Sequence, residues 1–224
     1  MGGHAAGDRA SDLAVRRLAR IVDDAEGDAE DDAEGDEEGD EEDDPRRDAS
    51  AEDRITRALT RAARDIDRLS EELGVDAGTT ATGAMLEGGE HPEAVVVNVG
   101  DSRVYRFEAG RLHQVTTDHS VVQELVDAGE LDADAAEYHP AANIITRALG
   151  FHEAPRPDFV RLPAAAGLRL LLCSDGLTKE VDRRHLRLLL ASGLSAEVTA
   201  SALVDAALAA GGRDNVSVIV VDVL

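Results

Sequence analysis

The sequence has no tryptophan and few aromatic residues, which make up 2% of its 224 residues. A folded core must therefore be built from Val, Leu, Ile and Ala. Cys173 is the only cysteine, so no intramolecular disulfide can form. This cysteine ends the apolar run Leu170–Cys173, where a buried and unreactive thiol is expected rather than a nucleophile.

Long apolar runs are also missing. No segment is long and apolar enough to span a bilayer, and the first residues are rich in Gly and charge rather than forming the apolar part of a signal peptide. These features predict a monomeric protein of the cytoplasm with no membrane partner.

Basic residues are outnumbered, with 23 Lys and Arg against 47 Asp and Glu, a formal net charge of −24. The excess is local, because residues 23–44 contain 16 acids and no Lys or Arg. An acidic surface does not favour binding to nucleic acid or to an anionic membrane. Residues 23–49 have almost no apolar side chains to bury, which predicts a disordered acidic insertion. A docking segment for a basic partner is the alternative.

Two amphipathic helices are predicted around this insertion. Ser11 is expected to cap the first, which runs to about Val22. Ser50, with Asp53 three residues later, is typical of the start of a second helix that continues to Leu73 and stops at Gly74.

The pattern from Thr79 onward changes to short strands and turns, which together with the helices predicts an α+β fold. The closing segment, Val216–Val223, is rich in Val and Ile, which is typical of a strand inside a sheet. Helices are expected over 121–128, 132–138, 183–190 and 196–210, and strands over 79–86, 94–99, 104–107, 112–115, 144–149, 158–162 and 168–173.

Five short motifs place acidic and small residues at turns along the chain. Each alone is ordinary turn chemistry, but the set in this order is hard to explain as turns. The motifs are Met1-Gly2-Gly3-His4, Gly100-Asp101-Ser102-Arg103, Thr117-Asp118-His119-Ser120, Ser174-Asp175-Gly176 and Gly211-Gly212-Arg213-Asp214-Asn215.

This set resembles the metal-dependent serine/threonine protein phosphatases of type 2C, the PPM family. The resemblance implies a four-layer α/β/β/α sandwich of two mainly antiparallel sheets flanked by helix pairs. It also implies hydrolysis of phosphoserine and phosphothreonine in proteins by metal-activated water, with two or three Mg²⁺ or Mn²⁺ ions. Hard cations of this kind prefer oxygen ligands, which these carboxylates supply.

By this resemblance, Asp175 and Asp214 match ligands of one core metal, and Asp101 matches an acid that holds an additional metal with Asp175. The alternative for each is a simple turn. Asn215 is expected to fix its turn by backbone hydrogen bonds, and Gly176 and Asp118 are expected to lie near the site.

Residues 118–143 match the family's flap, a variable segment beside the active site. Within or near it, His119 is expected to be a polar loop histidine rather than a general acid. Arg147, in the family-like run Ile145–Gly150, can pair with a carboxylate or stay solvated.

The match begins inside the family's first metal motif, Asp-Gly-x-Gly-Gly-His. Gly2, Gly3 and His4 align with its later positions, so its bridging Asp and the first strands of the family domain would precede Met1. We therefore expect a single domain over 1–224 that lacks its first strands and is catalytically impaired as given. A start assigned to an internal Met codon and a divergent natural product both explain this. A non-catalytic phosphatase-like binding module is the alternative function.

Overall fold

The computed structural model of the chain describes residues 4–23, 49–136 and 138–224. These residues form two compact units, one made of residues up to 79 together with 149–155, the other of residues 80–148 and 156–224. Across the described residues, no helix combines the length and the apolar character needed to cross a membrane. The predicted acidic insertion lies almost wholly outside the described residues.

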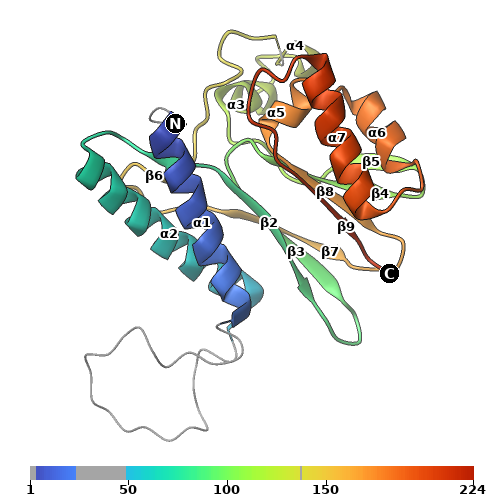
Figure 1. Cartoon of the computed structure of the whole chain (residues 1–224), viewed down its shortest axis with the longest axis horizontal. Helices are drawn as coiled ribbons and strands as arrows, with labels where there is room; N and C mark the ends of the chain where they lie inside the picture. The colour runs from blue at the N-terminus through green and yellow to red at the C-terminus, as the bar shows by residue number, and fades with distance from the viewer. Residues whose placement is uncertain (1–3, 24–48, 137) are drawn as a thin grey trace, which may run out of the picture. The chain divides into compact units, whose positions relative to one another are not determined.

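The first unit contains an antiparallel pair of helices, α1 (His4–Asp23) and α2 (Ala51–Leu73), which lie side by side in Figure 1. The Arg17 guanidinium lies 2.6 Å from Asp65 of α2, and Arg54 donates to the carbonyl of Ile21. A short antiparallel ladder joins β1 (Gly78–Thr79) to β6 (Leu149–Gly150) in the same unit.

The start and end of α2 are where the sequence placed them. The Ser50 side chain accepts a hydrogen bond from the Asp53 amide, and Gly74 ends the helix in the left-handed conformation. By contrast, the expectation that Ser11 caps α1 is wrong, because α1 begins at His4 and Ser11 donates to the Asp8 carbonyl within it. The added turns bury Ala6 and Ala10, small residues that continue the buried face of Ala14.

The second unit contains two antiparallel sheets. One has β2 (Ala81–Glu87), β3 (Glu93–Val99) and β7 (Asp158–Pro163) in that order. The other has the order β5 (Arg111–Gln114), β4 (Arg103–Glu108), β8 (Arg169–Cys173) and β9 (Val218–Asp222). Buried aliphatic side chains from both sheets form one cluster, which includes Val96, Val104 and Leu170. The predicted α+β class with antiparallel sheets is therefore confirmed.

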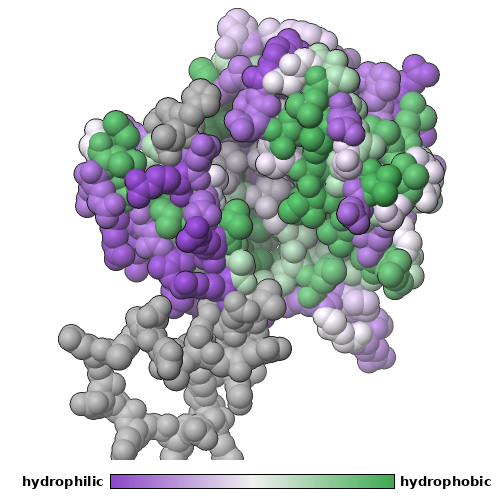
Figure 2. All heavy atoms as spheres, viewed as in Figure 1, coloured by the Kyte–Doolittle hydropathy of each residue, from purple (hydrophilic) through white to green (hydrophobic). Residues whose placement is uncertain are grey.

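Three helices pack on the four-stranded sheet, as Figure 1 shows: α5 (Asp175–Thr178), α6 (Arg183–Leu190) and α7 (Ala196–Ala210). Leu186, Leu190 and Leu203 bury their side chains against Tyr105 and Leu171 of the sheet. Figure 2 shows hydrophobic surface over α7. Val198 and Leu208 of this helix are exposed.

Two strand expectations need correction. Of the predicted strand 144–149, only Leu149 lies in a named strand, while Ile145 makes an isolated bridge to Ser120. The intervening main chain bonds elsewhere, with the Thr146 amide donating to the His119 carbonyl. The Val216–Val223 run forms β9, which among the described residues pairs only with β8 and is not an interior strand. The single turn α5 was not predicted.

The segment 118–143, predicted to be flap-like, carries α3 (Val121–Asp127) and α4 (Ala133–Ala136). Ser120 caps α3 by accepting a hydrogen bond from the Gln123 amide. Both helices agree with the expected positions to within two residues. The flap assignment itself remains a prediction.

Candidate metal centre

The Ser-Asp-Gly and Arg-Asp-Asn motifs lie against each other at one end of the four-stranded sheet. Ser174 directly follows β8, and its hydroxyl donates to the Asn215 carbonyl at 3.1 Å and accepts from the Ser217 amide at 3.0 Å. Its own amide donates to the Ser217 carbonyl. The 38 residues between Asp175 and Asp214 therefore return the chain to within hydrogen-bonding distance of its starting point.

Gly176 makes this approach possible. A β-carbon at Gly176 would lie 2.3 Å from the Asn215 carbonyl oxygen and 3.5 Å from the carbonyl carbon of Asp214. No ordinary side chain fits at that distance. The structure thus brings the backbone of Asp175-Gly176 against that of Asp214-Asn215.

Asp101 lies in the turn between β3 and β4. The turn needs Gly100, whose φ of +115° is left-handed and whose β-carbon would lie 2.3 Å from the Thr80 side chain. Burial, followed by the negative charge of Asp175, raises the pKa of Asp101 above its ordinary value. The charge of Asp175 therefore acts on Asp101 and disfavours its ionised form.

A lysine already pairs with one of these acids. The Lys179 ammonium lies 2.5 Å from Oδ2 of Asp175, one helical turn along the chain. Its positive charge also acts to lower the pKa of Asp101. Carboxylate oxygens are the ligands that a hard divalent cation prefers, so the types of residue here suit such an ion.

Asp214 is held by its own turn. The Asn215 amide donates to Oδ1 of Asp214 at 2.8 Å, so the predicted turn-fixing role of Asn215 rests on its backbone. Glu180, which sequence reasoning missed, fastens the same turn. Its carboxylate accepts from Arg213 through Nε at 2.8 Å and Nη2 at 3.0 Å.

The acids do not gather into a complete ligand set. Within the described ranges, no group of three or more His, Cys, Asp and Glu side chains is placed to hold a metal ion. Gly2 and Gly3 of the first motif lie outside the described residues. His4 begins α1 in the first unit.

Asp118 has a different set of partners from the other acids. It is 9% exposed and accepts from Arg103 through Nε at 2.9 Å and Nη2 at 2.6 Å, and from Gln114. Arg103 also donates to the Tyr105 hydroxyl. This buried fork ties the Asp118 loop to β4, which supports a structural role near the site. Beside it, burial raises the pKa of Cys173 to about 12, as expected of an unreactive thiol.

His119 lies in the loop between β5 and α3, as expected, and its side chain is buried there among polar partners. Its side chain is 4% exposed, and its Nε2 lies 2.9 Å from Oδ2 of Asp158. Arg147 pairs with the other oxygen of the same carboxylate at 2.7 Å, which answers the question left open for that residue. Burial acts to raise the pKa of Asp158, but the hydrogen bonds from His119 and Arg147 outweigh it and lower that pKa.

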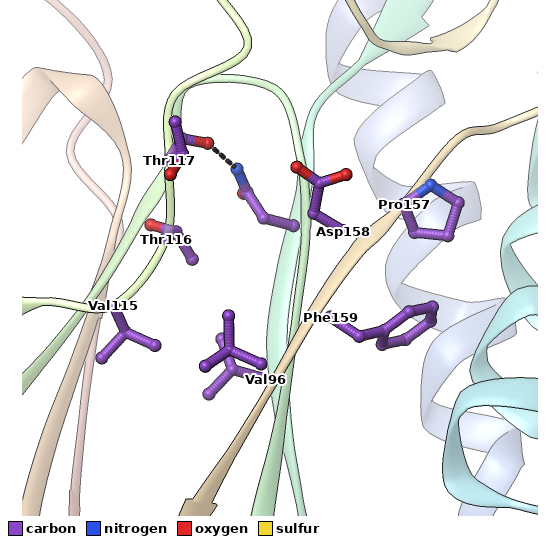
Figure 3. Close-up of a pocket in the computed structure, with 9 residues that line it drawn as sticks. Val96, Val115, Thr116, Thr117, Pro157, Asp158 and Phe159 are labelled. Atoms are coloured by element: carbon purple, nitrogen blue, oxygen red, sulfur yellow. Dashed lines mark hydrogen bonds between the residues drawn. The ribbon is translucent and has the colours of Figure 1, made fainter. Parts of the chain in front are cut away.

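A pocket of about 340 Å³ opens beside this histidine–carboxylate pair (Figure 3). Val96, Val115 and Phe159 give it apolar walls, and Thr117 and Asp158 lie at its polar end. None of Asp101, Asp175 and Asp214 lines it. The pocket is therefore separate from the acidic site.

Comparison with known proteins agrees with this architecture. The family model described as protein phosphatase 2C matches residues 1–210. The serine/threonine phosphatase stp of Listeria welshimeri is 33% identical over 231 residues, covering 99% of this chain and 81% of that protein. The chain belongs to the protein phosphatase 2C family.

The serine/threonine protein phosphatase PstP of Mycobacterium tuberculosis is 36% identical over 224 residues. The match covers all of this chain, which spans only 39% of the length of PstP. A crystal structure of the PstP catalytic domain in complex with two manganese ions superposes with a TM-score of 0.75 at 33% identity, covering 100% of this chain and 84% of that one.

Proposed function

We propose that this chain carries part of a metal-dependent phosphatase site that acts on phosphoserine and phosphothreonine in proteins. The observation that carries the proposal is the direct contact between the Asp175-Gly176 and Asp214-Asn215 backbones. The charge of Asp175 also acts on Asp101. Asp175 and Asp214 would hold one Mg²⁺ or Mn²⁺ ion, and Asp101 with Asp175 a further one. The manganese ions in the PstP structure support this choice of metal.

Such ions, when bound, supply an activated water and neutralise the phosphoryl oxygens. Residues of this chain position the proposed ligands and balance their charge. Ser174 and Gly176 set the distance between the two loops that carry Asp175 and Asp214. Lys179 neutralises the charge of Asp175 in this structure, and a divalent cation held there would supply that positive charge instead.

We further propose that residues 1–224 alone hydrolyse phosphopeptides slowly. By family resemblance, the bridging Asp belongs to the Asp-Gly pair that opens the first motif. The 224 residues match that motif only from its third position onward. The second candidate function is a non-catalytic phosphatase-like binding module. It is favoured by the lack, among described residues, of three metal-binding side chains placed together.

The proposed partners are phosphoproteins of the cytoplasm, bound by a monomer. Support for this comes from the names of the relatives, which are serine/threonine phosphatases, and from the acidic composition, which disfavours nucleic acid and anionic membranes.

Mn²⁺ titration followed by calorimetry tests the metal assignment on purified 1–224. We expect measurable binding that Asp175→Asn and Asp214→Asn each weaken by about tenfold or more, because a direct ligand contributes at least as much as the groups that orient it. Asp205→Asn is the matched control, an exposed acid on α7. Equal binding by all four proteins would refute the assignment.

A phosphothreonine peptide assay on the same proteins tests the catalytic proposal. Slow, Mn²⁺-dependent turnover that disappears in Asp175→Asn supports a partial site. Binding without any turnover supports the non-catalytic module. Fast turnover that Asp175→Asn abolishes would mean that the residues within 1–224 suffice, and would refute the proposed impairment.

A further inference from the structure

Both backbone polar groups of Gly100 are hydrogen-bonded to buried residues. Its amide donates to Nδ1 of His119 at 3.1 Å, while its carbonyl accepts from the Asn98 side chain at 3.0 Å and from the His119 amide at 2.9 Å. Asn98 is 1% exposed and His119 is 5% exposed. These bonds satisfy the polar groups of a backbone position that only glycine adopts readily, immediately before Asp101.

The bonds to His119 also fix which ring nitrogen carries hydrogen. A backbone amide can only donate, so Nδ1 of His119 must accept and carries no hydrogen. Nε2 therefore carries the hydrogen and donates to Oδ2 of Asp158 at 2.9 Å. The ring is oriented by the Gly100 amide on one nitrogen and the Asp158 carboxylate on the other. Nη1 of Arg147 also lies 3.2 Å from Nε2, but two donors cannot bond each other, so this contact adds no hydrogen bond in this tautomer.

Asp158 is in turn fixed by Arg147. The Arg147 guanidinium donates to Oδ1 of Asp158 at 2.7 Å and to the Arg156 carbonyl at 3.3 Å. In Figure 3 the Asp158 carboxylate points away from the apolar side chains of Val96 and Phe159. Because Asp158 begins β7 and pairs in register with Asn98 of β3, the carboxylate comes from a rigid sheet position.

We infer that Arg147, Asp158 and His119 form a relay of hydrogen bonds that positions Asp101 by clamping Gly100, and that His119 is thus a positioning residue for a metal ligand. The inference rests on the proposed function, in which Asp101 binds a cation. None of the three residues is one of the proposed ligands. Groups that orient a metal ligand typically change metal affinity by about 10–100-fold when they are replaced.

Two substitutions of His119 separate the clamp from simple packing. His119→Asn keeps an acceptor near the position of Nδ1, so it can still receive the Gly100 amide but cannot reach Asp158. His119→Gln places its amide near the position of Nε2, so it can still donate to Asp158 but offers no acceptor to Gly100. Both variants shrink the same buried side chain.

The first measurement is hydrogen exchange of the Gly100 amide by NMR on metal-free 1–224, which reports the clamp without any metal. We expect protection in His119→Asn within about threefold of the unmodified protein and a loss of about tenfold or more in His119→Gln. The second is Mn²⁺ affinity, which should fall by about tenfold in His119→Gln and be largely kept in His119→Asn.

Thermal midpoints of both variants provide the structural control. Equal losses of protection and affinity in the two variants, in proportion to their loss of stability, would reduce His119 to a packing residue and overturn the inference. Full protection of Gly100 in His119→Gln would overturn it as well.

Asp101→Asn distinguishes failure of this inference from failure of the proposed function. If Asp101→Asn binds Mn²⁺ like the unmodified protein, Asp101 is not a ligand and the metal role of the clamp is refuted, whatever the exchange data show. If Asp101→Asn weakens binding but His119→Gln does not, the metal assignment stands and only the positioning role fails.

Discussion

Gly176 and the Asn215 carbonyl are packed so closely that a β-carbon at residue 176 would lie 2.3 Å from the oxygen. The contact joins two segments far apart in sequence that carry the proposed metal ligands Asp175 and Asp214. A side chain at residue 176 could not be accommodated by a rotamer change, because the opposing atom belongs to the backbone. The glycine is therefore a requirement of the site and not only a turn residue.

Gly176→Ala should accordingly force the two loops apart. We expect a loss of about 1–3 kcal/mol in the free energy of unfolding, the usual effect of overpacking a tight contact. Mn²⁺ affinity should fall together with stability, because the two acids move relative to each other. Urea denaturation and Mn²⁺ calorimetry measure the two effects.

Gly88→Ala is the matched control for this substitution. Gly88 lies between β2 and β3, and a β-carbon there meets no atom within 4 Å. Its stability should stay within about 0.5 kcal/mol of the unmodified protein, as for other surface changes. An equally small effect of Gly176→Ala would contradict the close contact on which the site depends.

Asp101 is predicted to be a residue that lowers stability in the absence of metal. Its carboxylate is buried beside that of Asp175, which raises its pKa and disfavours the charged form. Asp101→Asn should therefore increase the thermal midpoint in EDTA, by ~3 °C if about 1 kcal/mol of repulsion is removed. The same substitution should reduce the stabilisation that added Mn²⁺ gives.

Asp134→Asn, at an exposed position in α4, serves as the control for the change of charge. It should leave both the midpoint in EDTA and the shift with Mn²⁺ unchanged. A lower midpoint for Asp101→Asn in EDTA would mean that this carboxylate stabilises the metal-free fold, and the repulsion argument would be wrong.

Local signals in the sequence were enough to predict the bounds of several helices. The boundaries of α2 follow from Ser50 and Gly74, whose side chain and backbone do what their residue types favour. The helices α6 and α7 have the predicted bounds for similar reasons, since Asp182 and Ser195 cap them. The first residue of α1 was missed because Ser11 resembles a cap but lies inside a longer alanine-lined face.

Non-local contacts explain what the sequence could not predict in the site. The partner of His119 is Asp158, 39 residues away, and the pairing depends on the register that places Asp158 opposite Asn98. No sequence motif predicts that strand register. The burial of His119 has the same origin, because its environment comes from strands that are distant in sequence.

Arg169 provides a test of pH dependence outside the site. It donates to both oxygens of Asp222 on β9, at 2.6 and 2.8 Å, and to the carbonyls of Leu190 and Leu194 near α6 and α7. The hydrogen bond from Arg169 lowers the pKa of Asp222 below its ordinary value of 3.8. The pair thus connects the edge strand to the helical layer.

Because the folded-state pKa of Asp222 is depressed, its contribution is present above the unfolded-state pKa and is lost as pH falls through the folded-state value. Asp222→Asn should be less stable than the unmodified protein near pH 7, by about 1 kcal/mol for a partly exposed charged pair. The difference should shrink as the pH is lowered below about 4. Urea midpoints from pH 3 to 7 measure it.

Asp12→Asn is the comparison for this series. Asp12 pairs with Arg16 on the exposed side of α1, where an i,i+4 pair contributes only about 0.3–0.5 kcal/mol. A difference between Asp222→Asn and the unmodified protein that stayed constant down to pH 3 would show that the carboxylate acts through packing and not through its charge.

The acidic segment is predicted to be dispensable for the helix pair that it joins. Deleting residues 24–44 removes 15 acids and leaves six residues between Asp23 and Ala51. Six residues suffice, because Arg54 at the start of α2 already donates to the Ile21 carbonyl near the end of α1 at 2.7 Å. Shortening the connection from 27 to six residues should stabilise the fold by about 1 kcal/mol through loop entropy alone. Removal of like charges acts in the same direction. We therefore expect a thermal midpoint equal to or ~3 °C above that of the full chain, and Mn²⁺ affinity within about twofold at physiological salt.

Replacing residues 24–44 by an uncharged Gly-Ser segment of equal length separates the two causes, since it keeps the loop entropy and removes the charge. A midpoint well below that of the full chain in both variants would mean that the acidic residues themselves help to hold α1 against α2.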